Sequence, residues 1–249
     1  MKLSDMVTID VNMDLGEGMT IEKQVMPFIS SCNVACGGHY GNYNSIKETL
    51  LLAQKHGVKT GAHPSFEDRE NFGRIHLDWN EARFRESVSK QIQQFHDVAL
   101  ELGITMNHIK MHGALYHATA HLTDYVKWTV QLVKDKYPEV KLYVPPGSLL
   151  ELELKNHGLS YDREAFADRR YVCEGKLVSR NDANAVIEDV SKLVNQLSMM
   201  VHEHKVICID EQEIPLNAQT YCVHGDNLSI VHNFNEVITA LNLNRIKIG

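Results

Sequence analysis

The strand-like segment at residues 10–14 restricts the fold of this chain more than any other feature. It reads Asp-Val-Asn-Met-Asp. Because side chains alternate between the two faces of a strand, Asp10, Asn12 and Asp14 share one face and the apolar residues share the other. An unpaired carboxylate in a protein interior is costly. Two interpretations of this segment are therefore open. It is either an edge strand with its polar face exposed to solvent, or the first strand of a barrel whose interior holds a polar site at its C-terminal mouth.

Apolar strand-like runs alternate with helix-like stretches along the chain, and no Pro/Gly/Ser-rich linker divides it. This alternation predicts a βα repeat with parallel strands, which favours the barrel. Principal strands are expected at residues 10–14, 31–36, 58–62, 108–112, 141–144, 159–162 and 220–224. Helices are expected at residues 44–56, 78–102, 123–136, 148–156, 181–202 and 229–243, and residues 205–216 are expected to form a two-stranded excursion. Seven principal strands do not support an eight-stranded closed barrel.

Local signals set some of the expected helix boundaries. Gly57 stands where a C-terminal cap belongs, and Gly103 follows the longest predicted helix. Thr123 is expected to cap the helix that follows it, and Asp182 is expected to begin the helix that ends near residue 202.

Composition argues against several classes of function. The formal net charge is −7, which disfavours nucleic acid as a main partner. No apolar run of about 18 residues is present, so no transmembrane helix or membrane partner is expected. The N-terminal sequence MKLSDM lacks the apolar stretch of a signal peptide. The five cysteines are irregularly spaced and imply no disulfide framework, so a reducing cytoplasm is the expected location.

Polar residues recur at the ends of the predicted strands. Parallel strands bring these ends to the C-terminal face of a βα barrel, where such barrels keep their active sites. Four histidines and three carboxylates hold these positions: His39, His63, His112 and His224, with Asp14, Glu17 and Asp226. A single histidine at a strand end is more often a structural residue than a ligand. The coincidence of all seven predicts a polar site.

The fourth predicted strand carries a lysine on its polar face. His108, Lys110 and His112 are two residues apart and share that face. A lysine that points into a barrel needs a partner, which Asp10 or Asp14 could supply. Both a structural ion pair and a catalytic or substrate-binding role stay open for this lysine.

Metal and nucleotide motifs give weaker guidance. The Asp/His/His composition is compatible with a divalent metal at the barrel mouth, with Asp14, His39 and His63 as candidate ligands. No His-Glu-x-x-His or Cys-x-x-Cys motif identifies the ion. Neither a Gly-x-x-x-x-Gly-Lys-Ser/Thr loop nor a Gly-x-Gly-x-x-Gly motif is present, so a nucleotide would bind by another device. Arg169 could form a fork with a carboxylate, whereas a solvated charge cluster is a serious rival interpretation for Arg170.

Six motifs follow one another along nearly the whole chain. They are DVNMDLGE at 10–17, NVACGGH at 33–39, GAHPS at 61–65 with FGR at 72–74, KMHGALY at 110–116, EAFADRRY at 164–171 and CVHGDN at 222–227. In this order they resemble the LamB/YcsF family, also called the A subunit of bacterial 5-oxoprolinase.

The resemblance implies an α/β fold formed by residues 1–249 as one domain. The implied architecture is an irregular seven-stranded (β/α) barrel, similar to the barrels of glycoside hydrolases and carbohydrate deacetylases. The implied activity is ATP-dependent opening of the small molecule 5-oxo-L-proline to L-glutamate. ATP with Mg²⁺ is the implied cofactor, separate B and C subunits are the implied partners, and a homo-oligomer is compatible with the sequence.

Roles for single residues follow as hypotheses. The expected catalytic set is Asp14, Glu17, His63, Lys110, His112 and His224. The expected substrate-binding set is Asn12, His39, Glu164, Asp168, Arg169 and Asp226. We expect Lys110 or Arg169 to hold the ring carboxylate. One histidine of the catalytic set is expected to act as general base or acid, oriented by one of the set's carboxylates, and the sequence does not rank the three.

Two other classes of function stay open. One is a metal-dependent amidase or deacetylase acting on another small substrate, and the other is a non-catalytic substrate-binding subunit. The chain has Gly38 where the family usually has Phe, and Tyr40-Gly41-Asn42 where the family usually has Ala-Gly-Asp. Asn42 thereby replaces an acid that could serve as a ligand or a helix cap. These departures leave the identity of the substrate open.

Overall fold

A closed parallel sheet forms the centre of the molecule. The structure is a computed structural model that describes residues 6–180 and 182–249. The barrel strands are β1 (Val7–Leu15), β2 (Ser31–Ala35), β3 (Lys59–His63), β4 (His108–Ile109), β5 (Lys141–Val144), β6 (Tyr161–Phe166) and β9 (Thr220–Cys222). They pair in chain order, and β9 pairs with both β6 and β1, which closes the ring. The predicted irregular seven-stranded (β/α) barrel is confirmed.

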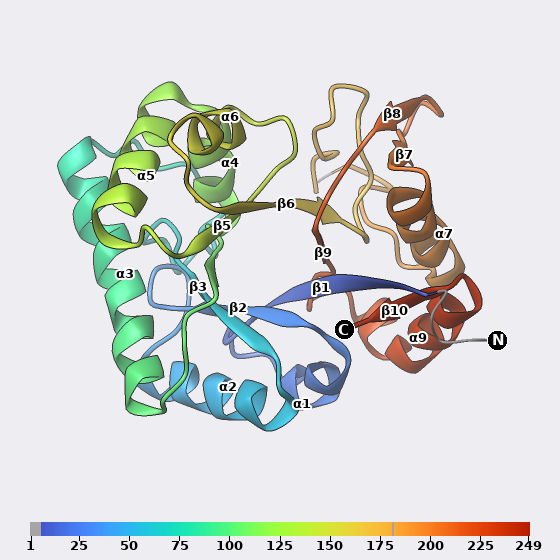
Figure 1. Cartoon of the computed structure of the whole chain (residues 1–249), viewed down its shortest axis with the longest axis horizontal. Coiled ribbons are helices and arrows are strands. Elements are labelled where there is room, and N and C mark those ends of the chain that lie inside the picture. The colour runs from blue at the N-terminus through green and yellow to red at the C-terminus, as the bar shows by residue number, and fades with distance from the viewer. Residues whose placement is uncertain (1–5, 181) are drawn as a thin grey trace.

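Helices surround this barrel (Figure 1). They are α1 (Glu22–Val25), α2 (Tyr43–His56), α3 (Glu81–Glu101), α4 (Gly113–His121), α5 (Thr123–Lys136), α6 (Leu149–Asn156), α7 (Val190–His202), α8 (Leu228–Val231) and α9 (Phe234–Leu243), with a 3₁₀ turn η2 (Met26–Phe28). In Figure 1, α3 and α5 lie on one side of the barrel, and α7 and α9 lie on the opposite side. No described helix is both long enough and apolar enough to cross a membrane.

The two faces of β1 behave as the alternation predicts. Val11 and Met13 are buried in the hydrophobic core. On the other face, the Asn12 side chain donates to Thr220 Oγ1 at 2.8 Å and accepts from Asn33 Nδ2 at 2.8 Å. The polar face of β1 therefore points into the barrel, and the alternative of an exposed edge strand is excluded.

Several strand boundaries differ from the prediction. The sixth strand covers Tyr161–Phe166 instead of residues 159–162, so Glu164 lies within it rather than after it. The regular ladder ends at Ile109 in β4 and at Cys222 in β9. The backbone after β4 stays attached to β3, because the Lys110 amide donates to Ala62 O at 3.0 Å. The prediction also missed β10 (Ile246–Ile248), which pairs in parallel with the start of β1.

Three helix predictions were wrong. The helix predicted from Asp182 begins at Val190, and residues 182–189 form turns and irregular backbone, while Asn181 lies outside the described residues. Thr123 is the first residue of α5 and not its cap. The predicted last helix is divided into α8 and α9, and α4 was missed.

Other local predictions are confirmed. Gly57 caps α2 in the left-handed conformation, with φ of 71°. The excursion at residues 205–216 is an antiparallel pair of β7 (Lys205–Ile207) and β8 (Glu213–Pro215). The replacement of an acid by Asn42, in contrast, does not remove the helix cap, because Asn42 caps the start of α2 in a reciprocal arrangement with Ser45. Its amide oxygen thus makes the bonds that a carboxylate would make at this position.

The cap of α7 gives a stability prediction. The Asp189 side chain accepts a hydrogen bond from the backbone amide of Lys192. We expect Asp189→Ala to lower the free energy of unfolding by about 1 kcal/mol, because one helix-end amide loses its partner. Urea unfolding measures the change. Asp182→Ala is the matched control and should have a much smaller effect; equal effects of the two variants would contradict this helix start.

Candidate active site at the barrel mouth

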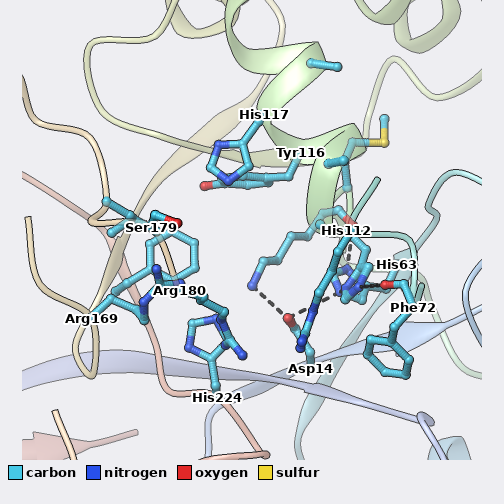
Figure 2. Close-up of a pocket in the computed structure, with 18 of the residues that line it drawn as sticks. Asp14, His63, Phe72, His112, Tyr116, His117, Arg169, Ser179, Arg180 and His224 are labelled. Carbon is cyan, nitrogen blue, oxygen red and sulfur yellow. Dashed lines mark hydrogen bonds and ion pairs between the residues drawn. The ribbon is translucent and has the colours of Figure 1, made fainter. Parts of the chain in front are cut away.

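A cavity of about 780 Å³ opens at the C-terminal mouth of the barrel (Figure 2). Eight of the residues singled out from the sequence line it: Asp14, Glu17, His63, Lys110, His112, Arg169, His224 and Asp226. Four others lie behind this lining: Asn12, His39, Glu164 and Asp168. The predicted gathering of polar strand ends at one face is therefore confirmed, although not every predicted residue reaches the cavity surface.

Lys110 lies between two carboxylates inside the barrel. Its Nζ is 2.9 Å from Asp14 Oδ1 and 2.8 Å from Glu164 Oε1. Asp10, the other expected partner, pairs instead with Lys59 at 3.2 Å. Burial alone would lower the pKa of Lys110, but the neighbouring acids outweigh it and hold that pKa well above its ordinary value. Lys110 is therefore charged and fully engaged, which favours the structural ion pair.

Three histidines lie together beside this ion pair: His63 and His112 line the cavity, and His39 lies just behind them. The rings of His39 and His112 stack at a centroid distance of 3.7 Å, and the ring of His63 stands edge-on to both. Each ring donates one N–H to a neighbouring oxygen. The acceptors are Ser65 Oγ at 2.9 Å for His39 Nδ1, Lys110 O at 2.7 Å for His63 Nδ1, and Phe72 O at 3.0 Å for His112 Nε2.

The direction of these bonds fixes the tautomers. A carbonyl oxygen accepts only, so His63 donates from Nδ1 and His112 donates from Nε2. The Ser65 hydroxyl gives its proton to Phe66 O, so it accepts from His39 Nδ1. In each neutral ring the second nitrogen therefore carries a lone pair.

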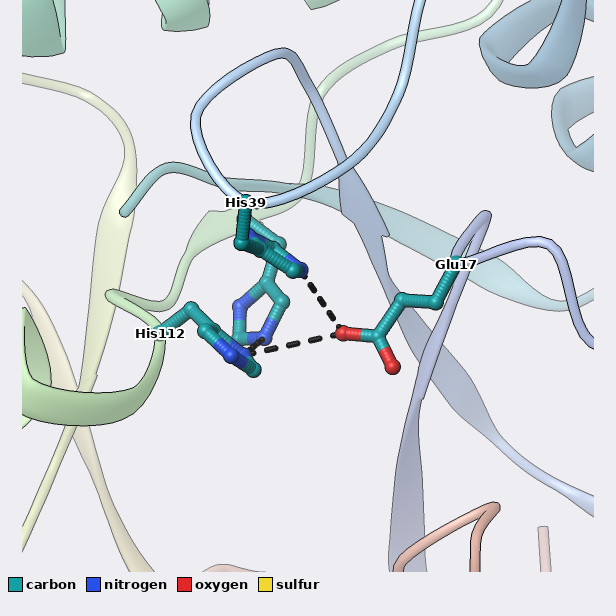
Figure 3. A group of neighbouring side chains, drawn as sticks. Glu17, His39 and His112 are labelled. Carbon is teal, nitrogen blue, oxygen red and sulfur yellow. Dashed lines mark hydrogen bonds and ion pairs between the residues drawn. The ribbon is translucent and has the colours of Figure 1, made fainter. Parts of the chain in front are cut away.

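The three nitrogen atoms that carry these lone pairs lie close to the Glu17 carboxylate, and Figure 3 shows His39 and His112 beside it. Glu17 Oε1 is 2.8 Å from His39 Nε2 and 3.6 Å from His112 Nδ1. His63 Nε2 is 2.9 Å from His112 Nδ1, and one ligand atom from each of the four residues lies within 4.8 Å of the others. Lone pairs at these distances repel one another unless a proton or a cation lies between them.

The donor set fits a divalent metal. Three imidazole nitrogens and one carboxylate suit zinc or another first-row ion, and histidine ligands usually donate their second N–H to a fixed oxygen, as all three do here. Of the predicted metal ligands, His39 and His63 belong to this group, whereas Asp14 lies beside it, with Oδ2 3.3 Å from His63 Nε2. Glu17 joins the group because Gly16 and Gly18, both at positive φ, turn the chain around it.

Burial shapes the ionisation of this group. Burial and the nearby Asp14 raise the pKa of Glu17 to about 7. Burial, aided by His63, lowers the pKa of His39 to about 2. In the metal-free protein a proton on Glu17 can therefore fill the gap between carboxylate and imidazole, which is the position that a cation would take.

A second histidine arrangement lies on another wall of the cavity. His224 Nδ1 is 2.8 Å from Asp168 Oδ1, and Asp168 Oδ2 accepts from the His224 amide at 3.1 Å and from Asn227 at 3.2 Å. Burial would raise the pKa of Asp168, but His224 outweighs it and lowers that pKa. The ionised Asp168 fixes Nδ1 as the donor, so the lone pair of His224 is on Nε2. Asp168 itself lies behind His224 and outside the cavity lining.

The rim of the cavity is cationic. Asp226 Oδ2 lies 3.2 Å from Arg74 Nη2 and 2.6 Å from Arg180 Nη1. Arg169 donates from Nη2 to Val178 O at 2.6 Å and thereby holds the loop that carries Arg180. Arg74 and Arg180 were not among the site residues predicted from the sequence. Arg74 stands in the FGR motif, which could have identified it, but no motif marks Arg180.

Comparison with known proteins places this site in a family. The sequence profile of the LamB/YcsF family matches residues 9–249. This chain belongs to the LamB/YcsF family. A protein of Staphylococcus carnosus, named as the A subunit of 5-oxoprolinase, is 38% identical over 249 residues, which cover 97% of this chain and 99% of that protein.

One solved structure agrees with this assignment, and a second shares only the fold. The lactam utilization protein of Thermus thermophilus has 31% identity and a TM-score of 0.89, and the match covers 97% of this chain and 99% of that one. A family 4 carbohydrate esterase of Streptomyces lividans has 9% identity and a TM-score of 0.50, with 97% and 91% coverage. The second likeness concerns the fold alone and agrees with the expected similarity to deacetylase barrels.

The LamB/YcsF motifs all contribute to the barrel mouth. The motif at 10–17 supplies the Asp14 and Glu17 carboxylates, and those at 33–39, 61–65 and 110–116 supply the three clustered histidines. The motif at 164–171 supplies Asp168, and the one at 222–227 supplies its partner His224. The order of motifs in the sequence thus corresponds to a circuit around one cavity.

Metal binding by this LamB/YcsF protein is directly measurable. We expect the chelator-treated chain to bind one equivalent of Zn²⁺ at the cluster of Glu17 and the three histidines, and His63→Asn to lose that binding. Isothermal titration calorimetry with cysteine-blocked protein measures this binding. The exposed cavity residue His76 gives the matched control, and His76→Asn should bind as wild type does. Equal binding by both variants would contradict the assignment.

The raised pKa of Glu17 predicts a pH effect on the metal-free protein. A carboxyl group whose pKa rises from 4.5 to about 7 on folding stabilises the fold below pH 4.5, and this contribution is lost as the pH rises through 7. The melting temperature of the wild type should therefore fall as the pH rises from about 5 to about 8. The melting temperature of Glu17→Gln should fall less over the same pH range. Thermal unfolding with chelator present checks this, and identical slopes in the two proteins would count against it.

Proposed function

We propose that this chain is the A subunit of an ATP-dependent 5-oxoprolinase, which opens 5-oxo-L-proline to L-glutamate together with separate B and C subunits. The names of the relatives support this proposal. The structural observation that carries it is one cavity with an oriented histidine, a cluster of converging lone pairs and a cationic rim. A lactam that bears a carboxylate presents complementary groups: a carbonyl to polarise, a C–N bond to break and an anion to hold.

His224 is the group best placed for proton transfer. Its Nδ1 donates to Asp168, so Nε2 can accept a proton from water as the water oxygen bonds to the ring carbonyl carbon. The ring C–N bond then breaks, and the leaving nitrogen takes a proton from His224. Among the three candidate histidines, His63 and His112 direct their lone pairs into the Glu17 cluster, which leaves His224 as the proposed base.

The Glu17 cluster is proposed to face the ring carbonyl. A divalent ion bound there would supply Lewis-acid polarisation of the carbonyl oxygen. The protein's own contribution is to hold His39, His63 and His112 in fixed tautomers with their N–H groups committed to nearby oxygens.

The ring carboxylate is proposed to bind at the arginine rim. Lys110 is engaged by Asp14 and Glu164 and is 2% exposed, so it is poorly suited to this task. Arg74 and Arg180 line the cavity and can present guanidinium groups to a carboxylate. Arg169 also lines the cavity, but its Nη2 and Nε already donate to Val178 O and Ala185 O, so it adds positive charge rather than a free fork. Of the two residues expected from the sequence to hold the ring carboxylate, Arg169 is therefore kept, and Arg74 and Arg180 are added to it.

ATP is proposed to activate an otherwise poor electrophile in the assembled enzyme: its γ-phosphoryl group is transferred to the amide oxygen, and ADP leaves. Addition of water and cleavage of the ring C–N bond then give the acyl phosphate of glutamate, which a second water hydrolyses to L-glutamate and phosphate. The chain has neither of the two familiar phosphate-binding glycine motifs. We therefore propose that ATP and Mg²⁺ bind with the participation of the B and C subunits.

The test is glutamate release from 5-oxo-L-proline by the purified chain with ATP and candidate B and C subunits, and with each component omitted in turn. The proposal predicts glutamate only in the complete mixture. Absence of glutamate from a complete mixture of folded, associated proteins would overturn it, as would full activity without this chain.

A second candidate function is a metal-dependent amidase or deacetylase. The cluster of four potential ligands is the observation that favours it. This function predicts hydrolysis of small amides or acetylated sugars by the isolated chain without ATP, lost on chelation and restored by metal. ATP-independent turnover would select it over the first proposal.

A further inference from the structure

A second group of potential ligands lies outside the cavity. Cys173, Cys208 and Asp210 each place one sulfur or oxygen atom within 4.8 Å of the others. Cys173 Sγ is 3.0 Å from Asp210 Oδ1 and 2.9 Å from Oδ2. Cys208 is 2% exposed, Cys173 is half-buried and Asp210 is exposed, so the group opens to solvent on one side.

Backbone hydrogen bonds join the two chain segments that carry this group. Residues 171–177 form a tight hairpin, in which Tyr171 pairs with Leu177 and the Val172 amide donates to Lys176 O at 2.8 Å. Tyr171 also pairs in parallel with Cys208, and the Ile209 amide donates to Tyr171 O at 2.8 Å. The three side chains therefore come from two fixed segments, the hairpin and the turn between β7 and β8, and not from one mobile loop.

We propose that Cys173, Cys208 and Asp210 bind a zinc-like divalent cation, with a water molecule as the fourth ligand. Two thiolates and a carboxylate are ligands that zinc accepts in tetrahedral sites. Ligands at about 2.0–2.3 Å from such an ion stand roughly 3.5–3.8 Å apart. The contact of Cys173 with Asp210, at 2.9–3.0 Å, must therefore lengthen by roughly 0.5 Å, and a pair at the 4.8 Å limit of the group must shorten by about 1 Å. Both cysteines are free thiols. A disulfide between them would not involve the Asp210 carboxylate, whereas a metal ion would bind all three side chains.

The position of the group links it to the barrel mouth. Lys176, Leu177 and Val178 follow Cys173 on the same segment and line the cavity. An ion that ties Cys173 to the β7–β8 turn would fix this wall of the cavity. The site shares no ligand with the Glu17 cluster, so it stands or fails independently of the proposed function.

Cobalt binding tests the proposal with the full chain. The reduced, metal-stripped protein is titrated with Co²⁺, and the thiolate-to-cobalt charge-transfer band is followed. The Glu17 cluster offers only nitrogen and oxygen ligands and gives no such band. The titration is made in a His63→Asn background, which removes the Glu17 cluster as a competing site. We expect the band to saturate there at one equivalent, to vanish in Cys173→Ser and Cys208→Ser, and to require at least about tenfold more cobalt in Asp210→Asn.

Two comparisons make the result decisive. Glu211→Gln changes the acid next to Asp210 and should leave the titration unchanged. Asp210 is exposed, so Asp210→Asn keeps the test valid if a serine variant fails to fold. The proposal is overturned if the reduced wild type shows no band, if the band survives in folded Cys173→Ser, or if Asp210→Asn titrates as Glu211→Gln does.

Discussion

Lys110→Met is expected to destabilise the protein by about 3–5 kcal/mol, because it removes the cation between Asp14 and Glu164. The two carboxylates would remain inside the barrel without a positive charge between them. Burial opposes the ionisation of Asp14, but His63 and Lys110 outweigh burial and hold its pKa well below 3.8. Urea unfolding near neutral pH measures the loss.

Two controls separate this effect from the loss of an ordinary ion pair. Lys59→Met breaks the pair with Asp10, in which the lysine side chain is 53% exposed, and should cost less than about 1 kcal/mol. The double variant Lys110→Met with Glu164→Gln should recover part of the loss. The stabilisation from the lowered pKa of Asp14 is present above pH 3.8 and is lost as the pH falls through the lowered pKa, so the difference between wild type and Lys110→Met should shrink in acid. A loss no larger than that of Lys59→Met would contradict the account of the barrel interior.

His224→Ala is expected to reduce kcat in the complete mixture of the proposed 5-oxoprolinase by about 10²–10⁴-fold, because it removes the proposed general base. Asp168→Asn should also reduce kcat, with little change in KM, since an amide no longer fixes the tautomer of His224. The variant should also shift the acidic limb of the pH–rate profile, which a merely structural role would not do.

His117→Asn is the matched control for both variants. His117 lines the same cavity and is exposed, yet it has no role in the proposed reaction. Its kcat should stay within about threefold of wild type. If His117→Asn and His224→Ala lose activity equally, or if neither does, the assignment of the base to His224 fails.

Local sequence patterns predicted the barrel well. The alternation in β1 and the apolar run of β5 are patterns of residues that adjoin one another in the sequence, so they can be recognised without tertiary contacts. The structure has a strand at both places. Boundaries failed where a tertiary contact competes with the local signal. Asp182 is a reasonable cap by itself, but residues 182–189 lie against the loop of Arg169 and Arg170, and the helix begins only after Asp189.

The sequence predicted which residues form the site but not the different roles of its histidines. The sequence showed three equivalent histidines, whereas the structure shows two whose lone pairs meet Glu17 and one that is oriented by Asp168. That difference depends on which oxygen accepts each N–H, and no motif encodes it. A backbone carbonyl accepts from His63 and from His112, whereas the Asp168 carboxylate accepts from His224. Arg180 was missed for a similar reason, because only the path of its loop brings it to Asp226.

Where 5-oxo-L-proline binds is the most direct test of the central claim. A crystal structure of the chain with this lactam measures it. We predict that the ring carbonyl faces the Glu17 cluster, that the carboxylate lies on the arginine rim, and that His224 Nε2 lies within reach of a water placed about 3–3.5 Å from the carbonyl carbon. A lactam bound outside the cavity, or inside it with its carboxylate on Lys110 and its carbonyl away from the cluster, would contradict the account.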